Sequence, residues 1–192
     1  MIFRFDGENL AAQRAAERAA AAMVTGISEE TRAALRALVV RAIHEGIPPY
    51  DAARIIVSMI GLTEQQSQAA MNYRESLINE GLSLDRINVL VDRYSAKLLR
   101  QRSVTIARTE IMGALNRGAL EAYGQAQQKG LLSGDAVKEW ITTPDERLCP
   151  VCAPLDGKQV PLKAMFETAN GPLPGPVAHP RCRCALAVTE PI

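Results

Sequence analysis

The sequence is poor in aromatic residues. Phenylalanine, tryptophan and tyrosine make up 4 % of its 192 residues, whereas hydrophobic residues make up 47 %. Alanine supplies much of this apolar content, which is typical of helical proteins whose slender helices pack closely. We therefore expect a mainly helical body whose core consists of small and aliphatic side chains.

The chain also lacks an excess of charge and a long hydrophobic run. Its formal net charge is +1, so it has neither the polycationic composition of many nucleic-acid-binding chains nor an acidic tail. No apolar run approaches the ~20 residues of a bilayer-spanning helix. The first residues do not show the charged, apolar and small-residue regions of a signal peptide. We expect a soluble protein in a reducing compartment, without a membrane partner.

Cysteine is scarce but concentrated. All four cysteines and one of the two histidines lie within residues 149–184. A Cys-x-x-Cys pair places two sulfurs on one side of a tight turn, and a second cluster follows about thirty residues later. Thiolate and imidazole ligands suit zinc better than magnesium or calcium. The sequence thus predicts a zinc site with five candidates for four positions: Cys149, Cys152, His179, Cys182 and Cys184.

The spacing leaves the ligand set open. Cys149 and Cys152 would be joined by two of the other three candidates. If both Cys182 and Cys184 bind, all four ligands are sulfurs. If His179 binds, one of these two cysteines is left as a buried thiol or as a group that supports the ligands without binding the metal. Reduced structural cysteines and two disulfides are the alternatives to a metal. The missing signal-peptide pattern argues against disulfides, which form in oxidising compartments.

Three common patterns of catalytic and phosphate-binding sites are missing from the sequence. It has no Ser/His/Asp order, no phosphate-binding glycine loop and no His-Glu-x-x-His motif. A metal hydrolase would need an open coordination position beside Asp145 and His179. Because the candidate ligands suffice to close the coordination sphere, a structural zinc site without an enzymatic role or a small-molecule substrate is favoured.

The first 130 residues carry repeated helix start and stop signals. Ser28 and Thr63 stand at N-cap positions, and glycines follow most of the helical runs. His44 is interpreted as a cation at a helix C-terminus, with no ligand role. Residues 1–8 are expected to form a docking strand or a tail. The pattern predicts helices at 9–24, 29–44, 51–60, 64–79, 84–102 and 104–128, the last two nearly continuous.

The pattern changes after Gly130. Residues 137–142 have strand character, Asp156-Gly157 is a hairpin signal, and 182–188 alternate as a final strand that would pair with the first. Residues 170–180 are rich in proline and glycine, which predicts an ordered or exposed loop. The expected fold class is α+β, divided into a helical region (1–82), a long helical segment (83–130) and a small, cysteine-clasped β module (131–192).

A basic helix face is the remaining candidate for binding. A long helix needs solvated charges, so the simpler interpretation is a solvent-exposed face. The alternative is a surface that holds phosphates by charge, in a zinc-stabilised nucleic-acid-binding adaptor. The candidate nucleic-acid contacts are Arg86, Arg93, Lys97, Arg100 and Arg102.

Two sequence segments carry a resemblance to a known family. The C-terminal half reads W-x4-D-x-R-x-C-x-x-C-x-x-L-x-G and then H-P-x-C-R-C, and an A-R-T-E segment followed by Asn116 and Gly118 precedes it. Together these segments resemble the phage Mu F-like head morphogenesis family, the minor head proteins of tailed phages. The matching residues of the C-terminal signature are Trp140, Asp145, Arg147, Cys149, Cys152, Leu155, Gly157, His179, Pro180, Cys182, Arg183 and Cys184.

The resemblance implies a structural role in head assembly. Family membership would place the protein in the virion, inside the head near the portal, and in the host cytoplasm during assembly. Its partners would be the portal protein and other head proteins, with DNA as a further candidate. The A-R-T-E segment also suggests a charge network in which Arg108 or Glu110 pairs with Asp145 or Arg147 across the junction to the β module.

Overall fold

The computed structural model describes residues 9–190, so the expectation for residues 1–8 lies outside the described part of the chain. Within it, the fold is α+β, as predicted, with helices followed by small antiparallel sheets. The helices are α1 (Leu10–Ala19), α2 (Glu29–Glu45), α3 (Pro49–Ile56), α4 (Glu64–Asn79) and α5 (Leu84–Gln128). None of the described helices is both long and apolar enough to cross a membrane.

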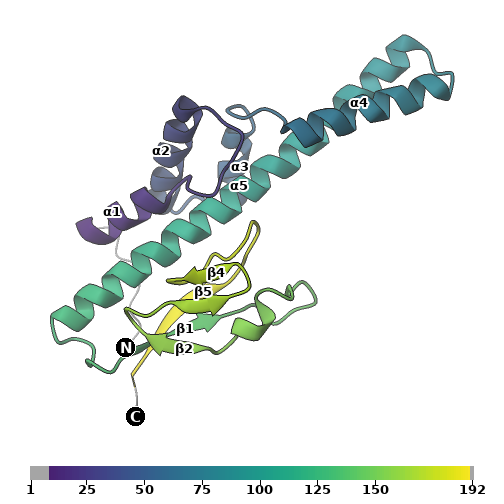
Figure 1. Ribbon diagram of the computed structural model, residues 1–192. Helices are drawn as coiled ribbons and strands as arrows, with labels where there is room; N and C mark the ends of the chain where they lie inside the picture. Colours follow the sequence, from purple (N-terminus) through teal and green to yellow (C-terminus); the bar gives the residue numbers. More distant parts are fainter. Residues whose placement is uncertain (1–8, 191–192) are drawn as a thin grey trace.

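Helix α5 is the spine of the molecule. Helices α1, α2 and α3 pack on one side of it, the β strands lie on the other, and α4 packs along its first half (Figure 1). Its 45 residues correspond to a length of roughly 67 Å. The sequence predicted nearly continuous helices at 84–102 and 104–128, and the structure has one unbroken helix across both ranges. Within it the Ser103 hydroxyl donates to the carbonyl oxygen of Arg100, so this buried polar group is satisfied without breaking the helix.

The helix starts follow the predicted caps. The Ser28 hydroxyl accepts a hydrogen bond from the Thr31 amide, and Thr63 and Gln66 form a reciprocal capping box. Gly46 ends α2 in the left-handed conformation, at φ 67°. These starts depend on contacts within four residues, which explains why the sequence alone located them.

Two helices end earlier than predicted. Helix α1 stops at Ala19 instead of Val24, because the amide of Met23 donates to the carboxylate of Glu110 on α5 instead of continuing the helix. Helix α3 stops at Ile56 instead of residue 60, where the Ser58 hydroxyl bonds the Ile55 carbonyl oxygen. Both corrections reflect hydrogen bonds that compete with the helical ladder.

The helical core is built mainly from alanine and aliphatic side chains. Leu35, Ile56 and Ala107 are fully buried where α2, α3 and α5 meet, and Val39 and Ile106 extend this cluster. Ala16 of α1, and Ala20 and Ala21 directly after it, lie in the same core. Small side chains thus allow α1 to approach α5 closely, as the low aromatic content suggested.

The β module contains two sheets. Strands β1 (Val137–Ile141), β2 (Gln159–Pro161) and β5 (Ala185–Thr189) form an antiparallel sheet in the order β2-β1-β5. Pairing of the final strand with the first confirms the prediction. Strands β3 (Phe166–Thr168) and β4 (Gly171–Leu173) form a hairpin, and β4 lies at the start of the predicted 170–180 loop. This hairpin closes at Gly171, whose φ of 99° favours glycine.

A second core lies inside the β module. Trp140 is fully buried, and its ring meets that of Phe166 edge to face at a centroid distance of 5.2 Å. Leu155, from the short helix η1 (Ala153–Leu155), packs into the same cluster. One of the few aromatic pairs of the chain therefore lies where the module has little aliphatic surface to bury.

Polar side chains of α5 fix the position of the β module. The Asn116 side chain donates to the Cys184 carbonyl oxygen (3.1 Å) and accepts from the Leu186 amide (2.9 Å). The Tyr123 hydroxyl donates to the Leu186 carbonyl oxygen at 3.4 Å. Because these groups are buried, a shift of β5 along α5 would break these hydrogen bonds at a place that water does not reach.

Lys138 is a buried cation beneath the 170–178 segment. Its Nζ donates to the Pro174 carbonyl oxygen at 2.7 Å and lies 5.4 Å from the centroid of the Phe166 ring. Burial lowers the pKa of Lys138 to about 8, and the nearby charge of Arg117 adds to this effect. The folded protein therefore holds this proton less tightly than the unfolded chain does.

Replacing Asn116 by alanine should lower the free energy of unfolding by about 2–4 kcal/mol, because a buried carbonyl and a buried amide lose their partner. Denaturant titration followed by the fluorescence of Trp140, the single tryptophan, measures this change. Asn72→Ala, on the exposed surface of α4, is the matched control and should be nearly neutral. Equal stability of the two variants would contradict this role of Asn116.

The stability of the wild-type protein relative to Lys138→Met should rise with pH between about 8 and 10.5. In this window the folded protein has released the Lys138 proton, whereas the unfolded chain still binds it. The expected gain is on the order of 2 kcal/mol. Free energies of unfolding of both proteins at several pH values test it. A constant difference would show that Lys138 titrates alike in both states.

Candidate metal centre

The sheet brings the two halves of the cysteine cluster together. Cys149 and Cys152 lie in the turn between β1 and η1, whereas His179, Cys182 and Cys184 lie on the segment that leads into β5. Since β1 and β5 are hydrogen-bonded neighbours, residues about thirty positions apart in sequence meet at one end of the module. The fold thus gathers all five predicted ligand candidates in one place.

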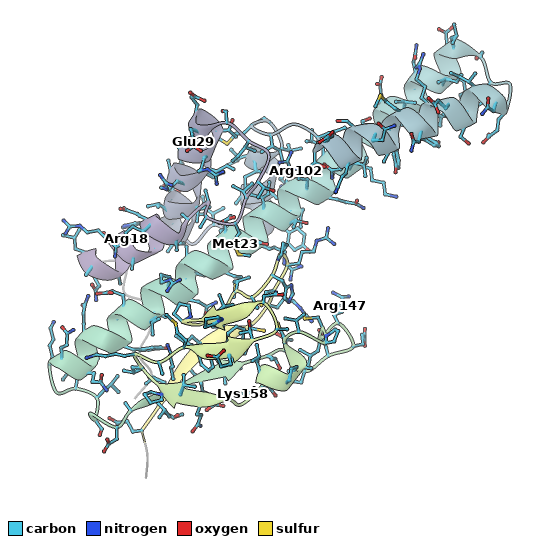
Figure 2. All side chains as sticks on the ribbon, in the orientation of Figure 1. Arg18, Met23, Glu29, Arg102, Arg147 and Lys158 are labelled. Carbon is cyan, nitrogen blue, oxygen red and sulfur yellow. The ribbon has the colours of Figure 1, made fainter. Side chains whose placement is uncertain are left out.

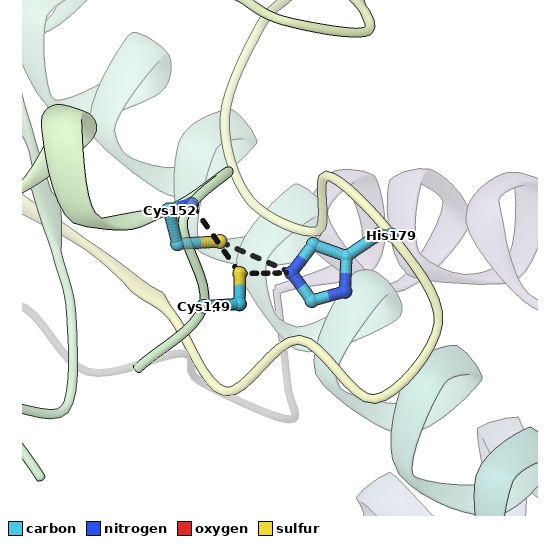
Figure 3. A group of neighbouring side chains, drawn as sticks. All are labelled: Cys149, Cys152 and His179. Atoms are coloured by element: carbon cyan, nitrogen blue, oxygen red, sulfur yellow. Dashed lines mark hydrogen bonds between the residues drawn. The ribbon is translucent and has the colours of Figure 1, made fainter. Parts of the chain in front are cut away.

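The sulfur and nitrogen atoms are close enough to share a cation. His179 Nε2 lies 3.0 Å from Cys149 Sγ and 3.2 Å from Cys152 Sγ (Figure 3). Cys152 Sγ lies 3.7 Å from Cys182 Sγ. The ligand atoms of Cys152, Cys182 and Cys184 all lie within 4.8 Å of one another. The cluster could hold a metal ion, with Cys152 common to both groups.

Second contacts orient the candidate ligands. His179 Nδ1 lies 2.8 Å from the Pro180 carbonyl oxygen. In the tautomer that donates this hydrogen bond, the lone pair of Nε2 faces the sulfurs, as a metal ligand requires. The Cys152 amide donates to Cys149 Sγ at 3.4 Å. Both arrangements stabilise electron-rich ligand atoms around one point.

The four thiols of the cluster do not all ionise on their own. Burial raises the pKa of the Cys152 thiol to about 12, and hydrogen bonding with Cys182 raises the pKa of Cys184. Hydrogen bonding from Cys184 lowers the pKa of Cys182 to about 5. The sulfurs are thus too crowded and too buried to ionise together. A bound cation would remove this obstacle, at the expense of releasing protons.

The space at the cluster fits one ion. Residues around the five candidates enclose a cavity of about 30 Å³, which is room for an atom or a water rather than for a substrate. All four cysteines are free thiols, so the disulfide alternative is not formed. The chemistry of the donor set, sulfur with imidazole, fits a soft or borderline cation.

The predicted charge network across the junction is not formed. Glu110 is buried and accepts a hydrogen bond at 3.1 Å from the amide of Met23, which follows α1. Asp145 instead pairs with Arg183 within the β module, at 2.6 Å between Oδ1 and Nη2, and accepts from the Arg147 amide. Among residues 9–190, no ion pair joins Arg108 or Glu110 to Asp145 or Arg147.

The contacts of Asp145 explain why the pKa of its carboxyl is low. The hydrogen bond from Arg183 lowers the pKa of this carboxyl to about 2. Asp145 therefore remains ionised at neutral pH, and its charge is engaged by a neighbouring guanidinium. The pair joins the first cysteine turn to the Arg-Cys segment before β5, so it braces the cluster from outside.

Adjacent residues of α5 hold opposite sides of the fold, a feature that sequence reasoning missed. Thr109 accepts a hydrogen bond from the Arg181 amide of the β module at 2.9 Å, while Glu110 holds the segment after α1. Arg181 adds a 2.7 Å bond from Nε to the Thr105 hydroxyl. The A-R-T-E pattern pointed to this part of α5, but the charges of Arg108 and Glu110 drew the prediction, and its threonine carried no signal for a contact with the β module.

The candidate nucleic-acid contacts separate into two groups. Arg86, Arg93, Lys97 and Arg100 are exposed on α5. Arg102 is buried, and its guanidinium donates to the carbonyl oxygens of Thr25, Gly26 and Gly61 (Figure 2). Arg102 is therefore not available to phosphates. Its hydrogen bonds hold the loops before α2 and α4 against the spine.

Replacing Cys152 by serine should abolish uptake of one soft divalent cation by the reduced protein, because Cys152 belongs to both ligand groups. Titration with Co²⁺, followed by sulfur-to-metal charge-transfer absorption, measures the uptake. The control His44→Ala removes the other histidine, whose Nε2 lies 2.9 Å from Gln13 Nε2, and should bind like wild type. Full uptake by Cys152→Ser would rule out this centre.

Comparisons with known proteins bear on the whole site. No curated protein and no solved structure matches the chain. One family matches, described as Phage Mu protein F like protein, over residues 33–187. The match includes the spine, both halves of the cysteine cluster and the strands that join them. The chain therefore belongs to the Phage Mu protein F like family, which indicates a phage head morphogenesis protein.

Proposed function

We propose that this protein is a structural minor head protein of a tailed phage or prophage, attached at or near the portal. It would aid head assembly and contribute to DNA packaging or ejection. The observation that supports this most directly is the family match across residues 33–187. It would reside in the virion, inside the head near the portal, and in the host cytoplasm during assembly.

The metal in this proposal is zinc with a structural role. Cys149, Cys152, His179 and Cys182 would be the ligands, since short contacts link these four side chains in series. Cys184 would remain as a buried thiol beside them. A module of some sixty residues with a three-stranded sheet buries little apolar surface, so a metal clasp supplies stability that its core lacks.

The helical half and the β module would have different roles in this function. The exposed side of the helical half would meet the portal and other head proteins. The clasped β module would act as a rigid body on α5, held by Asn116 and by the Arg181 contacts. A rigid body of this kind suits a protein that must fit one place in an assembly.

A metal hydrolase is the weaker alternative. It would need Asp145 and His179 beside an open coordination position. Asp145 is held by Arg183, and the cavity of about 30 Å³ leaves no room for a substrate. These contacts favour a closed site without an enzymatic role.

The copy number of this chain in purified virions tests the proposal. A portal-associated protein should be present in a few copies per particle, comparable to the portal ring or fewer. Quantitative mass spectrometry against the major capsid and portal proteins of the same particles provides the number. Absence from both virions and procapsids would contradict a role as a minor head protein.

A further inference from the structure

Four exposed cations form a straight stripe on α5. Arg86, Arg93, Lys97 and Arg100 follow one another at spacings of seven, four and three residues, which places them on the same face of the helix. Arg86 and Arg100 stand 14 positions apart, which is about 21 Å along the helix axis. This alignment comes from the helix itself, because α5 is unbroken through this region.

The stripe is not neutralised within the described chain. No aspartate or glutamate stands three or four residues before or after any of its four members. Arg93 and Lys97 are i,i+4 neighbours, and Lys97 and Arg100 are i,i+3 neighbours, so like charges face each other. Among residues 9–190, no ion pair includes a member of the stripe. An ordinary solvent-exposed helix face would alternate positive and negative charges, whereas the stripe places like charges next to one another.

The stripe lies on a part of the molecule that stands away from the rest. Helix α4 runs antiparallel to the first half of α5. The Tyr73 and Tyr94 rings meet at a centroid distance of 4.9 Å and a tilt of 47°, and Arg74 donates a hydrogen bond to Asn88. This two-helix arm extends beyond α1, α2, α3 and the β module (Figure 1). A long polymer could therefore lie along the arm without meeting the body.

A groove extends the stripe toward the body. At its inner end Arg100 lines a cavity of about 570 Å³ between α3 and α5, together with Tyr50 and Arg54. The Arg54 and Tyr50 side chains are largely exposed. Arg54 pairs with Asp51 at 3.5 Å, so its charge is partly neutralised. The groove thus leads from the stripe to the Tyr50 ring, which offers a polyanion a surface for stacking or apolar contact.

We propose that this basic stripe binds the phosphate backbone of double-stranded DNA without sequence preference. A row of cations along 21 Å of rigid helix suits a polymer with closely and evenly spaced charges. The choice of DNA over an acidic protein rests on the proposed function, since DNA is the polyanion inside a phage head. The contact would let the arm hold or guide DNA while the β module stays bound to α5.

The test is binding of the full-length protein to a duplex of mixed sequence, measured by fluorescence anisotropy over a range of salt concentrations. Four phosphate contacts predict a slope of about −3.6 for log K against log salt. Affinity should therefore fall roughly 150-fold between 50 and 200 mM salt. Changing Arg86, Arg93, Lys97 and Arg100 to glutamine should remove nearly all of this binding. Glutamine keeps helix propensity, so the arm should remain folded.

A control variant distinguishes the effect of the stripe on DNA binding from the effect of the protein's net charge. Arg14, Lys129, Lys158 and Lys163 are exposed cations outside the stripe, and Lys158 lies on the β module (Figure 2). Their change to glutamine removes the same charge and should leave the slope near that of wild type. Equal losses in both variants, or no DNA binding by the wild-type protein at low salt, would overturn the proposal. The virion copy number is independent of these results, so either proposal can fail alone.

Discussion

The fold depends on hydrogen bonds from polar side chains in the middle of α5 to the backbones of separate segments. Arg102 holds the loops before α2 and α4, Glu110 holds the segment after α1, and Asn116 holds the start of β5. Each of these side chains is buried, so each must be satisfied. The helix therefore specifies where its neighbours lie, while the alanine-rich core supplies attraction with little directional preference.

Local signals account for what the sequence predicted well. The caps at Ser28 and Thr63 depend on a few neighbouring residues. The two halves of the cysteine cluster are also local patterns, although they lie about thirty residues apart and the sheet brings them together. The ends of α1 and α3 and the partner of Glu110 depend on tertiary contacts that a single sequence does not display. Glu110 illustrates the limit: its sequence suggested an ionic partner, but the fold supplies the backbone amide of Met23.

The candidate metal centre and the attachment of the β module share one short piece of chain. Residues 179–186 supply three of the five ligand candidates and also the groups that meet Thr109 and Asn116. Ordering this piece around a cation would position the docking groups in advance, which lowers the conformational entropy lost on docking. Binding of a cation would therefore be coupled to attachment to α5 through backbone order rather than through charge.

The unbroken length of α5 has a mechanical consequence. The helix carries the two-helix arm at one end and the β module along its other half, and no proline interrupts it. Such a rod transmits displacement rather than absorbing it at a hinge. A tilt of about 5° over its roughly 67 Å would shift the far end by about 6 Å. A load on the arm would thus reach the β module as movement of the whole spine.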